Sequence, residues 1–324
     1  MKKLIYKQLL FVISKTNILV GGQAVMDGIM MRVPGAYATA VRNKENKIES
    51  YRKDFVSIVK KNKKLNLPII RGMIHLYESL KIGFETLNWS ADIAFPEDQK
   101  QSNKIADIFM NIVSASFAIL LFFILPLGLT TIFADVEQKP FYFNLISGAV
   151  RISIFIIYLL ALSLSKEVKK LFQYHGAEHR VVYNFESGKK LGITQAKTFP
   201  NEHPRCGTSF MFIIMIIGII TFSIFDTGII YFFGEIKLYT RILIHIPLTP
   251  FVAGIGYEFL KMTAKYRHLL VFKLLSAPGI MLQKITTKDP SDQQLEVGLA
   301  AIELGFGKKL KKYQGKTFKA EAIG

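Results

Sequence analysis

The chain has 324 residues, a formal net charge of +18 and a hydrophobic content of 50%. Its mean hydropathy is +0.29. High hydropathy combined with high charge excludes one ordinary globular core and favours a chain divided between lipid-embedded and basic aqueous segments. The single cysteine, Cys206, excludes an intramolecular disulfide framework. The many Ile, Lys, Phe and Asn residues are typical of a bacterial protein from an AT-rich genome.

Residues 1–104 are predicted to form a cytoplasmic N-terminal region that contains a β-hairpin and an amphipathic helix. The N-terminus lacks a continuous apolar segment and a small-residue cleavage site, so we predict no signal peptide. Residues 38–42 and 48–52 flank a polar turn, which predicts the hairpin. Pro68 precedes an amphipathic helix that runs to about Trp89 and either packs on a soluble core or lies in the membrane interface.

Two further N-terminal segments have an open interpretation. The lysine run at 60–64 is either a solvated loop or a contact with anionic lipid. The segment from Gly21 to Arg32 is dense in glycine, but no Lys-Ser or Lys-Thr completes a phosphate-binding loop. Its glycines favour tight backbone packing or positive φ angles, and Gln23, Asp27 and Arg32 are candidates to face a polar site.

Four stretches are long and apolar enough to cross a hydrocarbon core of about 30 Å. We therefore predict a mainly α polytopic membrane protein with a small cytoplasmic α+β N-terminal region. Residues 105–165 hold the first two transmembrane helices, and residues 208–261 hold the third and fourth. The expected spans run over residues 112–133, 141–164, 208–225 and 242–260.

The distribution of basic residues orients these spans. Lys and Arg concentrate in residues 1–104, in the 166–207 segment and after the fourth span, whereas the connections 134–140 and 226–241 are short and poor in them. The positive-inside rule then places both termini and the 166–207 segment in the cytoplasm. An even number of spans agrees with this orientation, which predicts a multi-pass protein of the bacterial inner (cytoplasmic) membrane.

The cytoplasmic 166–207 segment carries the chemistry. His175 and His179 stand one helical turn apart, so both imidazoles share one helix face and can meet one metal ion. Glu178 falls at the edge of that face, where it could activate a metal-bound water. The order His-x-x-Glu-His is the inverted zincin pattern. We therefore predict His175 and His179 as metal ligands and Glu178 as the catalytic residue.

A second pair of candidate ligands lies just before the third span. His203 and Cys206 are both zinc-binding residue types, and with the first pair they could complete a tetrahedral site. Cys206 could equally be a buried hydrophobe, and Glu178 could be an ion-pair partner of Arg205 or of a lysine. Glu202 and Glu258 are further candidates for a ligand or for a residue that positions one.

Two ionisable residues fall within predicted spans. Intramembrane ionisable groups are functional candidates because they are costly to bury. We interpret His245 as structural, because it lies near an interface and is flanked by prolines. Arg151 is expected to snorkel outward or to pair with an acidic residue, namely Asp135, Glu137 or Asp226.

The C-terminal part, residues 262–324, is predicted to contain an interfacial or re-entrant segment and a cytoplasmic tail. Residues 269–282 are apolar but too short and too interrupted for a fifth span. A helix start at residues 289–292 predicts a short amphipathic helix over 295–304. The basic residues 308–319 are expected to be flexible.

Five segments of the chain are long and distinctive. They are Gly21–Arg32 (GGQAVMDGIMMR), His175–His179 (HGAEH), His203–Phe210 (HPRCGTSF), Pro250–Glu258 (PFVAGIGYE) and Ala277–Ala301. These segments resemble the DUF1385 (YqhQ-like) family of bacterial membrane proteins, and the resemblance covers almost the whole chain. It implies a predicted metal-dependent enzyme whose reaction is not established. One departure is Asp27, where the family more often has Glu.

Two hypotheses of function follow. In the first, the protein is a membrane-embedded hydrolase that uses Zn²⁺ or another divalent metal at the cytoplasmic face and acts on a lipid-linked or membrane-associated substrate. In the second, it is a non-catalytic scaffold or transport-related membrane protein with a structural metal site or none. The sequence has no recognition motif for nucleic acid, and it defines no oligomeric state.

Overall fold

Four antiparallel strands near the N-terminal end form one meander. The computed structural model of the protein describes residues 20–96, 104–266 and 269–318. Sequence neighbours pair throughout the sheet, in the order β1-β2-β3-β4. The strands are β1 (Gly21–Val25), β2 (Gly28–Val33), β3 (Ala36–Arg42) and β4 (Ile48–Asp54).

Strand β2 lies inside this sheet and is covered on both faces. Because successive side chains of a strand point to opposite faces, Ile29 and Met31 enter one apolar core, and Met30 enters another. Strand β2 therefore has no alternating polar pattern. The hairpin of β3 and β4 matches the sequence prediction, whereas the β1–β2 hairpin within the glycine-rich segment was missed for this reason.

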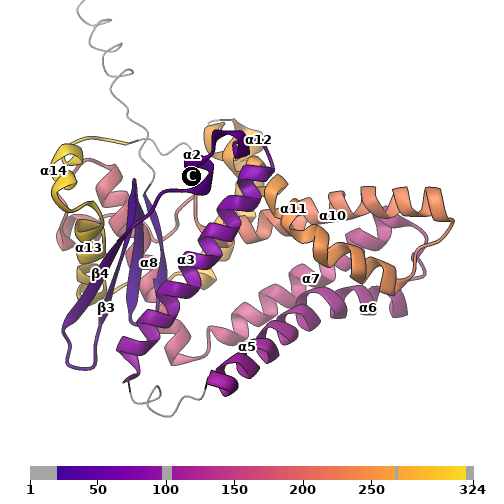
Figure 1. Ribbon diagram of the computed structural model, residues 1–324, viewed down its shortest axis with the longest axis horizontal. Coiled ribbons are helices and arrows are strands. Elements are labelled where there is room, and N and C mark those ends of the chain that lie inside the picture. Colours follow the sequence, from indigo (N-terminus) through magenta and orange to yellow (C-terminus); the bar gives the residue numbers. More distant parts are fainter. Residues whose placement is uncertain (1–19, 97–103, 267–268, 319–324) are drawn as a thin grey trace, which may run out of the picture.

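Three helices enclose the sheet (Figure 1). Helices α8 (Lys166–Glu186) and α13 (Asp292–Phe306) build the main core with one face, through residues such as Val181, Leu295 and Ile302. Helix α3 (Ile70–Ala94) places Ile82 against Tyr37 on the other face. We refer to the sheet with these three helices as the α/β body. Helix α13 buries its apolar face there and leaves Glu296 and Glu303 exposed, so the predicted amphipathic helix is confirmed.

Short elements complete the body and its surroundings. The basic segment that was expected to be flexible instead packs on the α/β body. Phe318 is buried, and its ring stacks on Phe185 at 5.2 Å between ring centroids. An apolar side chain within a lysine-rich segment accounts for this packing. The short elements are α2 (Ile58–Lys61), η1 (Lys63–Leu65), α9 (Ile193–Ala196), η3 (Gly307–Lys309) and α14 (Leu310–Tyr313).

Long apolar helices extend from the α/β body to the other end of the molecule (Figure 1). Among the described residues, four are long and apolar enough to cross a membrane, which confirms the predicted fold class. The first is continuous through α5 (Lys104–Ile119), a π-helical turn η2 (Leu120–Ile124) and α6 (Leu125–Phe133). The others are α7 (Pro140–Leu162), α10 (Gly207–Phe233) and α11 (Leu238–Lys265).

A buried polar cluster joins three of these helices at the end remote from the α/β body. The Asp226 carboxylate accepts hydrogen bonds from Asn144, Arg241 and His245, at 2.8, 3.0 and 2.9 Å respectively. Asp226, Arg241 and His245 have no exposed surface. The structural interpretation of His245 agrees with this geometry.

Arg151 has a different contact from those predicted. Its guanidinium lies over the ring of Phe123, 5.2 Å from the ring centroid. Arg241, which the sequence interpretation did not single out, is the arginine that pairs with Asp226. The two arginines lie on different helices. Arg241 lies in the first turn of α11, just after the short connection from α10, so the reversal of the chain there brings it back beside Asp226.

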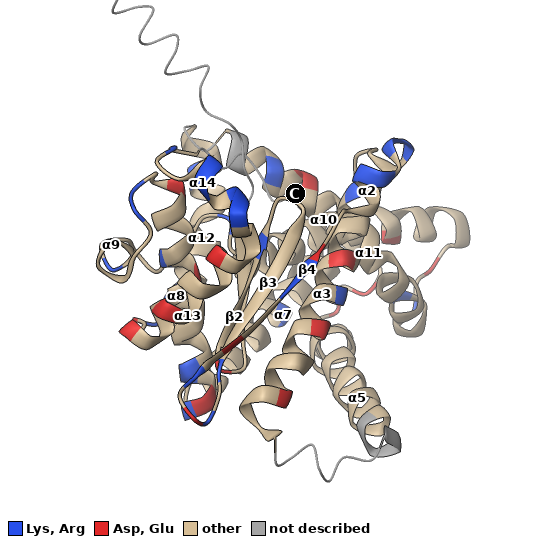
Figure 2. Cartoon of the chain, turned by 60° about the vertical axis from the view of Figure 1, so that its left-hand side comes forward, with Lys and Arg blue, Asp and Glu red and all other residues tan. Residues whose placement is uncertain are grey.

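Helix α12 (Leu270–Thr286) is a single 17-residue helix that contains Pro278. Its first half exposes apolar side chains, among them Leu270, Val271 and Leu274. The description of residues 269–282 as interfacial or re-entrant stays a prediction. Figure 2 shows the charged residues on the α/β body and the ends of the long helices, whose middle parts are mostly uncharged.

Candidate metal centre

Helix α8 carries the His-x-x-Glu-His pentapeptide on a buried face. Ser165 caps the start of the helix, where its side chain accepts a hydrogen bond from the backbone N–H of Val168, and Glu167 lies favourably in the first turn. Four residues of separation bring the rings of His175 and His179 to 4.5 Å between centroids. The expected sharing of one helix face is therefore correct.

The chain after α12 passes very close to α8 because residue 176 is glycine. A Cβ atom at Gly176 would collide with the backbone carbonyl of Lys288. This approach lets the backbone N–H of Lys288 donate to the Phe172 carbonyl at 2.9 Å. It also brings the Thr286 carbonyl to within 2.8 Å of Nδ1 of His175. Gly176 thus allows a backbone acceptor to orient the first histidine.

Both histidines are oriented in the same way. Nδ1 of His175 lies against the Thr286 carbonyl, and Nδ1 of His179 lies against the Asn201 carbonyl. Since a carbonyl oxygen can only accept, each Nδ1 carries a proton, and Nε2 is the ring atom that a metal ion could bind once Nε2 is deprotonated. Histidines that bind metals commonly donate their other ring N–H to a carbonyl or carboxylate in this manner.

Cys206 completes the cluster from the start of α10. It is the residue that precedes this 27-residue helix, and its Sγ lies 3.1 Å from Nε2 of His175. One candidate ligand atom from each of His175, His179 and Cys206 falls within 4.8 Å of the others. Among the described residues, these three form the group that could hold a metal ion.

The electrostatics of this trio favour a thiolate. Burial would raise the pKa of Cys206, but His175 and His179 hold it well below its ordinary value. Burial would likewise lower the pKa of His175, but the adjoining Cys206 raises it to about 9. The thiolate is the form of cysteine that binds metals, and the positive end of the α10 dipole also stabilises it.

Glu178 lies beside the trio without belonging to it. Its carboxylate oxygen is 3.5 Å from Nε2 of His179, and burial raises its pKa against the opposing effect of His179 and His175. Strand β1 covers this side chain so closely that a Cβ on Gly22 would lie 3.0 Å from its Cγ. The glycine-rich segment therefore packs directly on the predicted catalytic residue.

Arg205 is the partner of Glu186 rather than of Glu178. Glu186 also lies near His203, with 3.7 Å between its carboxylate oxygen and Nε2 of that ring. His203 packs next to His179, with ring centroids 5.5 Å apart, but it is not one of the three grouped ligands. Of the four predicted metal ligands, the structure thus groups three and places His203 beside them.

Gln283 is a site residue that sequence reasoning missed. Its fully buried amide accepts from the backbone N–H of His203 at 2.7 Å and donates to the His203 carbonyl at 2.9 Å and to Ser209 at 2.8 Å. These bonds fix the turn that presents Cys206. The one available signal was its position within the Ala277–Ala301 segment that resembles the family, since a lone glutamine has no distinctive spacing.

The remaining candidates have partners outside the trio. Glu258 forms an ion pair with Arg71, in which two guanidinium nitrogens donate to the two carboxylate oxygens, and Asp27 pairs with Lys170 at 2.6 Å. Glu202 contributes its backbone carbonyl to the hydroxyl of Tyr183. Gln23 donates to the Gly83 carbonyl and to Thr86.

A cavity of about 1150 Å³ opens on the cluster, at the junction between the α/β body and the long helices. Its walls include His175, Glu178, His179, His203 and Cys206, together with residues of β1, α3, α10 and α11. The cluster is thus accessible from a space large enough for an extended ligand.

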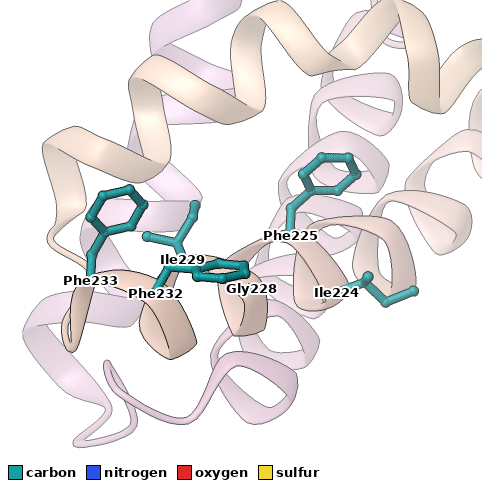
Figure 3. Close-up of a pocket in the computed structure, with 6 residues that line it drawn as sticks. All are labelled: Ile224, Phe225, Gly228, Ile229, Phe232 and Phe233. Atoms are coloured by element: carbon teal, nitrogen blue, oxygen red, sulfur yellow. The ribbon is translucent and has the colours of Figure 1, made fainter.

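A second hollow, of about 270 Å³, lies on α10 (Figure 3). Five apolar side chains and Gly228 line it, and Ile224 and Phe232 are largely exposed. It offers no polar group for chemistry, so the cavity at the His/Cys cluster is the candidate site.

These features define a multi-span helical protein that joins a small α/β body to a His/Cys cluster. The chain belongs to the DUF1385 family, described as proteins of unknown function, which matches residues 67–307. It is 30% identical over 304 residues to the uncharacterized protein YqhQ of Bacillus subtilis (strain 168), with 87% of this chain and 90% of that protein covered. No solved structure matches the chain.

Proposed function

We propose that the protein is a membrane-embedded, metal-dependent hydrolase in which His175, His179 and Cys206 hold a divalent ion. The observation that carries this proposal is the orientation of the ligands. Both histidines commit Nδ1 to a backbone carbonyl and leave Nε2 near the Cys206 sulfur. Two imidazoles and a thiolate are a donor set suited to Zn²⁺.

Three protein ligands would leave one coordination position open, which is typical of catalytic zinc. An ion bound there would supply Lewis-acid polarisation and a more acidic water. The role of the protein is then to accept a proton at the Glu178 carboxylate, which lies next to His179 and faces the cavity. His203 lies beside the trio and is the candidate for a group that contacts the substrate, because as a fourth ligand it would close the open position.

The placement of the site on the cytoplasmic face has independent support from the main core. That core combines Ile29, which precedes the first span, Val181, which lies between the second and third, and Leu295, which follows the fourth. Segments that pack together must lie on the same side of the membrane. The basic excess in these segments then favours the cytoplasm, so both termini would lie on the cytoplasmic side of a bacterial inner membrane. The substrate would be lipid-linked or membrane-associated.

Metal analysis of the full chain, purified in detergent without chelators, tests the metal site. We expect about one zinc per chain in the wild type and in Glu178→Gln, and almost none in His175→Ala, because two remaining ligands bind weakly. His75→Ala is a matched control, since His75 lines the same cavity outside the trio. A wild-type protein without metal would remove the proposed site.

Genetic complementation tests the catalytic role of Glu178. Glu178→Gln should keep the metal and the fold but fail to reverse the defects of a strain from which the gene is deleted. Full complementation would contradict catalysis by Glu178. A metal held by four protein ligands, with His203 as the fourth, would instead favour the non-catalytic scaffold, because structural zinc sites are closed.

A further inference from the structure

The walls of the cavity carry many cationic side chains. Among the described residues that line it, Glu178 is the one carboxylate, whereas six are lysine or arginine. A water-filled site with such walls concentrates anions. Whether these charges can attract a ligand depends on whether the side chains already form ion pairs with carboxylates outside the cavity.

The three arginines of the wall are already balanced by carboxylates. Arg71 pairs with Glu258, and Arg205 pairs with Glu186. Arg32 lies 3.7 Å from the carboxylate of Glu78, which is only 3% exposed. These arginines therefore brace the cavity and add little net charge to it.

The three lysines of the wall are not balanced in this way. Within the described ranges, Lys60, Lys63 and Lys261 form no ion pair with a carboxylate within 4.0 Å. Lys60 and Lys63 come from the α2–η1 segment, which is a blue stretch without acidic residues in Figure 2. Lys261 comes from the end of α11 that adjoins the α/β body. Three lysines from two distant segments thus line one cavity.

The same cavity has apolar walls supplied by the long helices. Phe210 lies in the first turn of α10, and Leu260 lies near the end of α11. Leu76 and Ile82 of α3 add to this surface. A ligand that satisfies both kinds of wall has an anionic group and a hydrocarbon part.

We propose that the cavity binds a lipid whose headgroup carries a phosphate, with the phosphate at Lys60, Lys63 and Lys261 and the hydrocarbon along Phe210 and Leu260. Lysine is a common point-charge partner of phosphate. This inference gives a substrate class to the proposed hydrolase and rests on that function, but the binding itself does not require the metal. Free inorganic phosphate has the same anionic chemistry and must be distinguished by experiment.

The test measures ligand binding to the full chain in neutral detergent by native mass spectrometry. The probes are dioctanoyl phosphatidate, dioctanoylglycerol, which has the same chains without the phosphate, and inorganic phosphate. A triple variant of Lys60→Gln, Lys63→Gln and Lys261→Gln should bind phosphatidate about tenfold more weakly than the wild type. Dioctanoylglycerol and inorganic phosphate should both bind more weakly than phosphatidate to the wild type.

Two matched variants control for charge and for folding. Replacing Lys190, Lys284 and Lys308 by Gln removes the same net charge from exposed positions outside the cavity, and this variant should bind phosphatidate as the wild type does. Replacing Lys60, Lys63 and Lys261 by Arg keeps the charge and should retain most of the binding. Equal loss in both Gln triples would overturn the proposal, as would equal affinity for phosphatidate and inorganic phosphate.

A His175→Ala variant separates this inference from the proposed function. If it loses zinc but still binds phosphatidate, the lipid site and the metal site both stand as separate parts of one cavity. If wild-type protein binds phosphatidate but contains no metal, the hydrolase proposal fails and the lipid site remains. If it contains metal but does not prefer phosphatidate, the lipid inference alone is wrong.

Discussion

The two ends of the long helices each contain a buried cluster of histidine and carboxylate, but the clusters differ in what their polar atoms face. At the remote end, Asp226 accepts from Asn144, Arg241 and His245, so its charge is balanced within the protein. At the junction with the α/β body, His175 and His179 donate to backbone carbonyls, and their Nε2 atoms remain near Cys206.

The contacts of the ring nitrogens therefore separate a structural histidine from a candidate ligand. His245 makes its bond to a carboxylate through Nε2, has no exposed surface and lines no described cavity. In His175 and His179, Nδ1 lies against a backbone carbonyl, and both residues line a large cavity together with Cys206. Burial and residue type are similar in both clusters, so the group that each ring nitrogen faces is the informative property.

The largest expected effect is on stability at the remote cluster. Asp226→Asn leaves the buried Arg241 guanidinium with only the partly exposed Glu137 carboxylate, at 3.9 Å, as a compensating charge, which should cost about 3–5 kcal/mol. Thermal unfolding in detergent should show a strongly destabilised protein or none that folds. Any folded fraction should have the same zinc content as the wild type, because His175, His179 and Cys206 lie at the other end of the helices.

A double variant keeps this prediction testable if Asp226→Asn does not fold. Combining it with Arg241→Gln leaves no net charge buried, so part of the lost stability should return. A folded Asp226→Asn protein of wild-type stability that has lost its zinc would contradict the contrast between the two clusters.

A smaller effect is expected from Gly176→Ala on α8. The added methyl group collides with the Lys288 backbone and should cost about 1–3 kcal/mol. It also moves the Thr286 carbonyl away from His175, which should weaken zinc binding about 10–100-fold, as for other groups that position metal ligands. Chelator competition measures the affinity, and thermal unfolding measures the stability.

Gly228→Ala is the matched control for this variant. Gly228 is also helical, but nothing lies within 4 Å of an added Cβ. Its stability should remain within about 1 kcal/mol of the wild type, with unchanged zinc affinity. Unchanged zinc affinity in Gly176→Ala would show that the close approach of residues 286–288 does not position His175.

The smallest effect is expected from Asp27→Asn in the turn between β1 and β2. Asp27 has a positive φ of 49°, which Asn tolerates well, so the change isolates the ion pair with Lys170. Loss of this partly exposed pair should cost less than about 1 kcal/mol and leave zinc content unchanged. A marked loss of zinc would instead show that Asp27 contributes to the metal centre.

Local patterns predicted much of this molecule. Span length and apolarity depend only on neighbouring residues, so the four long helices were recognised directly. The shared face of His175 and His179 follows from helical spacing. The β3–β4 hairpin likewise has a polar turn between two strand-like segments.

The tertiary structure decided which of these residues meet. Cys206 reaches the histidines because α10 begins beside α8. Gln283 and the Thr286 carbonyl come from a segment 80 residues or more beyond His203 in the chain. Backbone acceptors leave no residue type to recognise in a sequence. The sequence by itself determined a membrane protein with a His-x-x-Glu-His helix; only packing between distant segments distinguished Cys206 from His203 and made Glu258 an ion-pair partner, because such contacts depend on the whole fold.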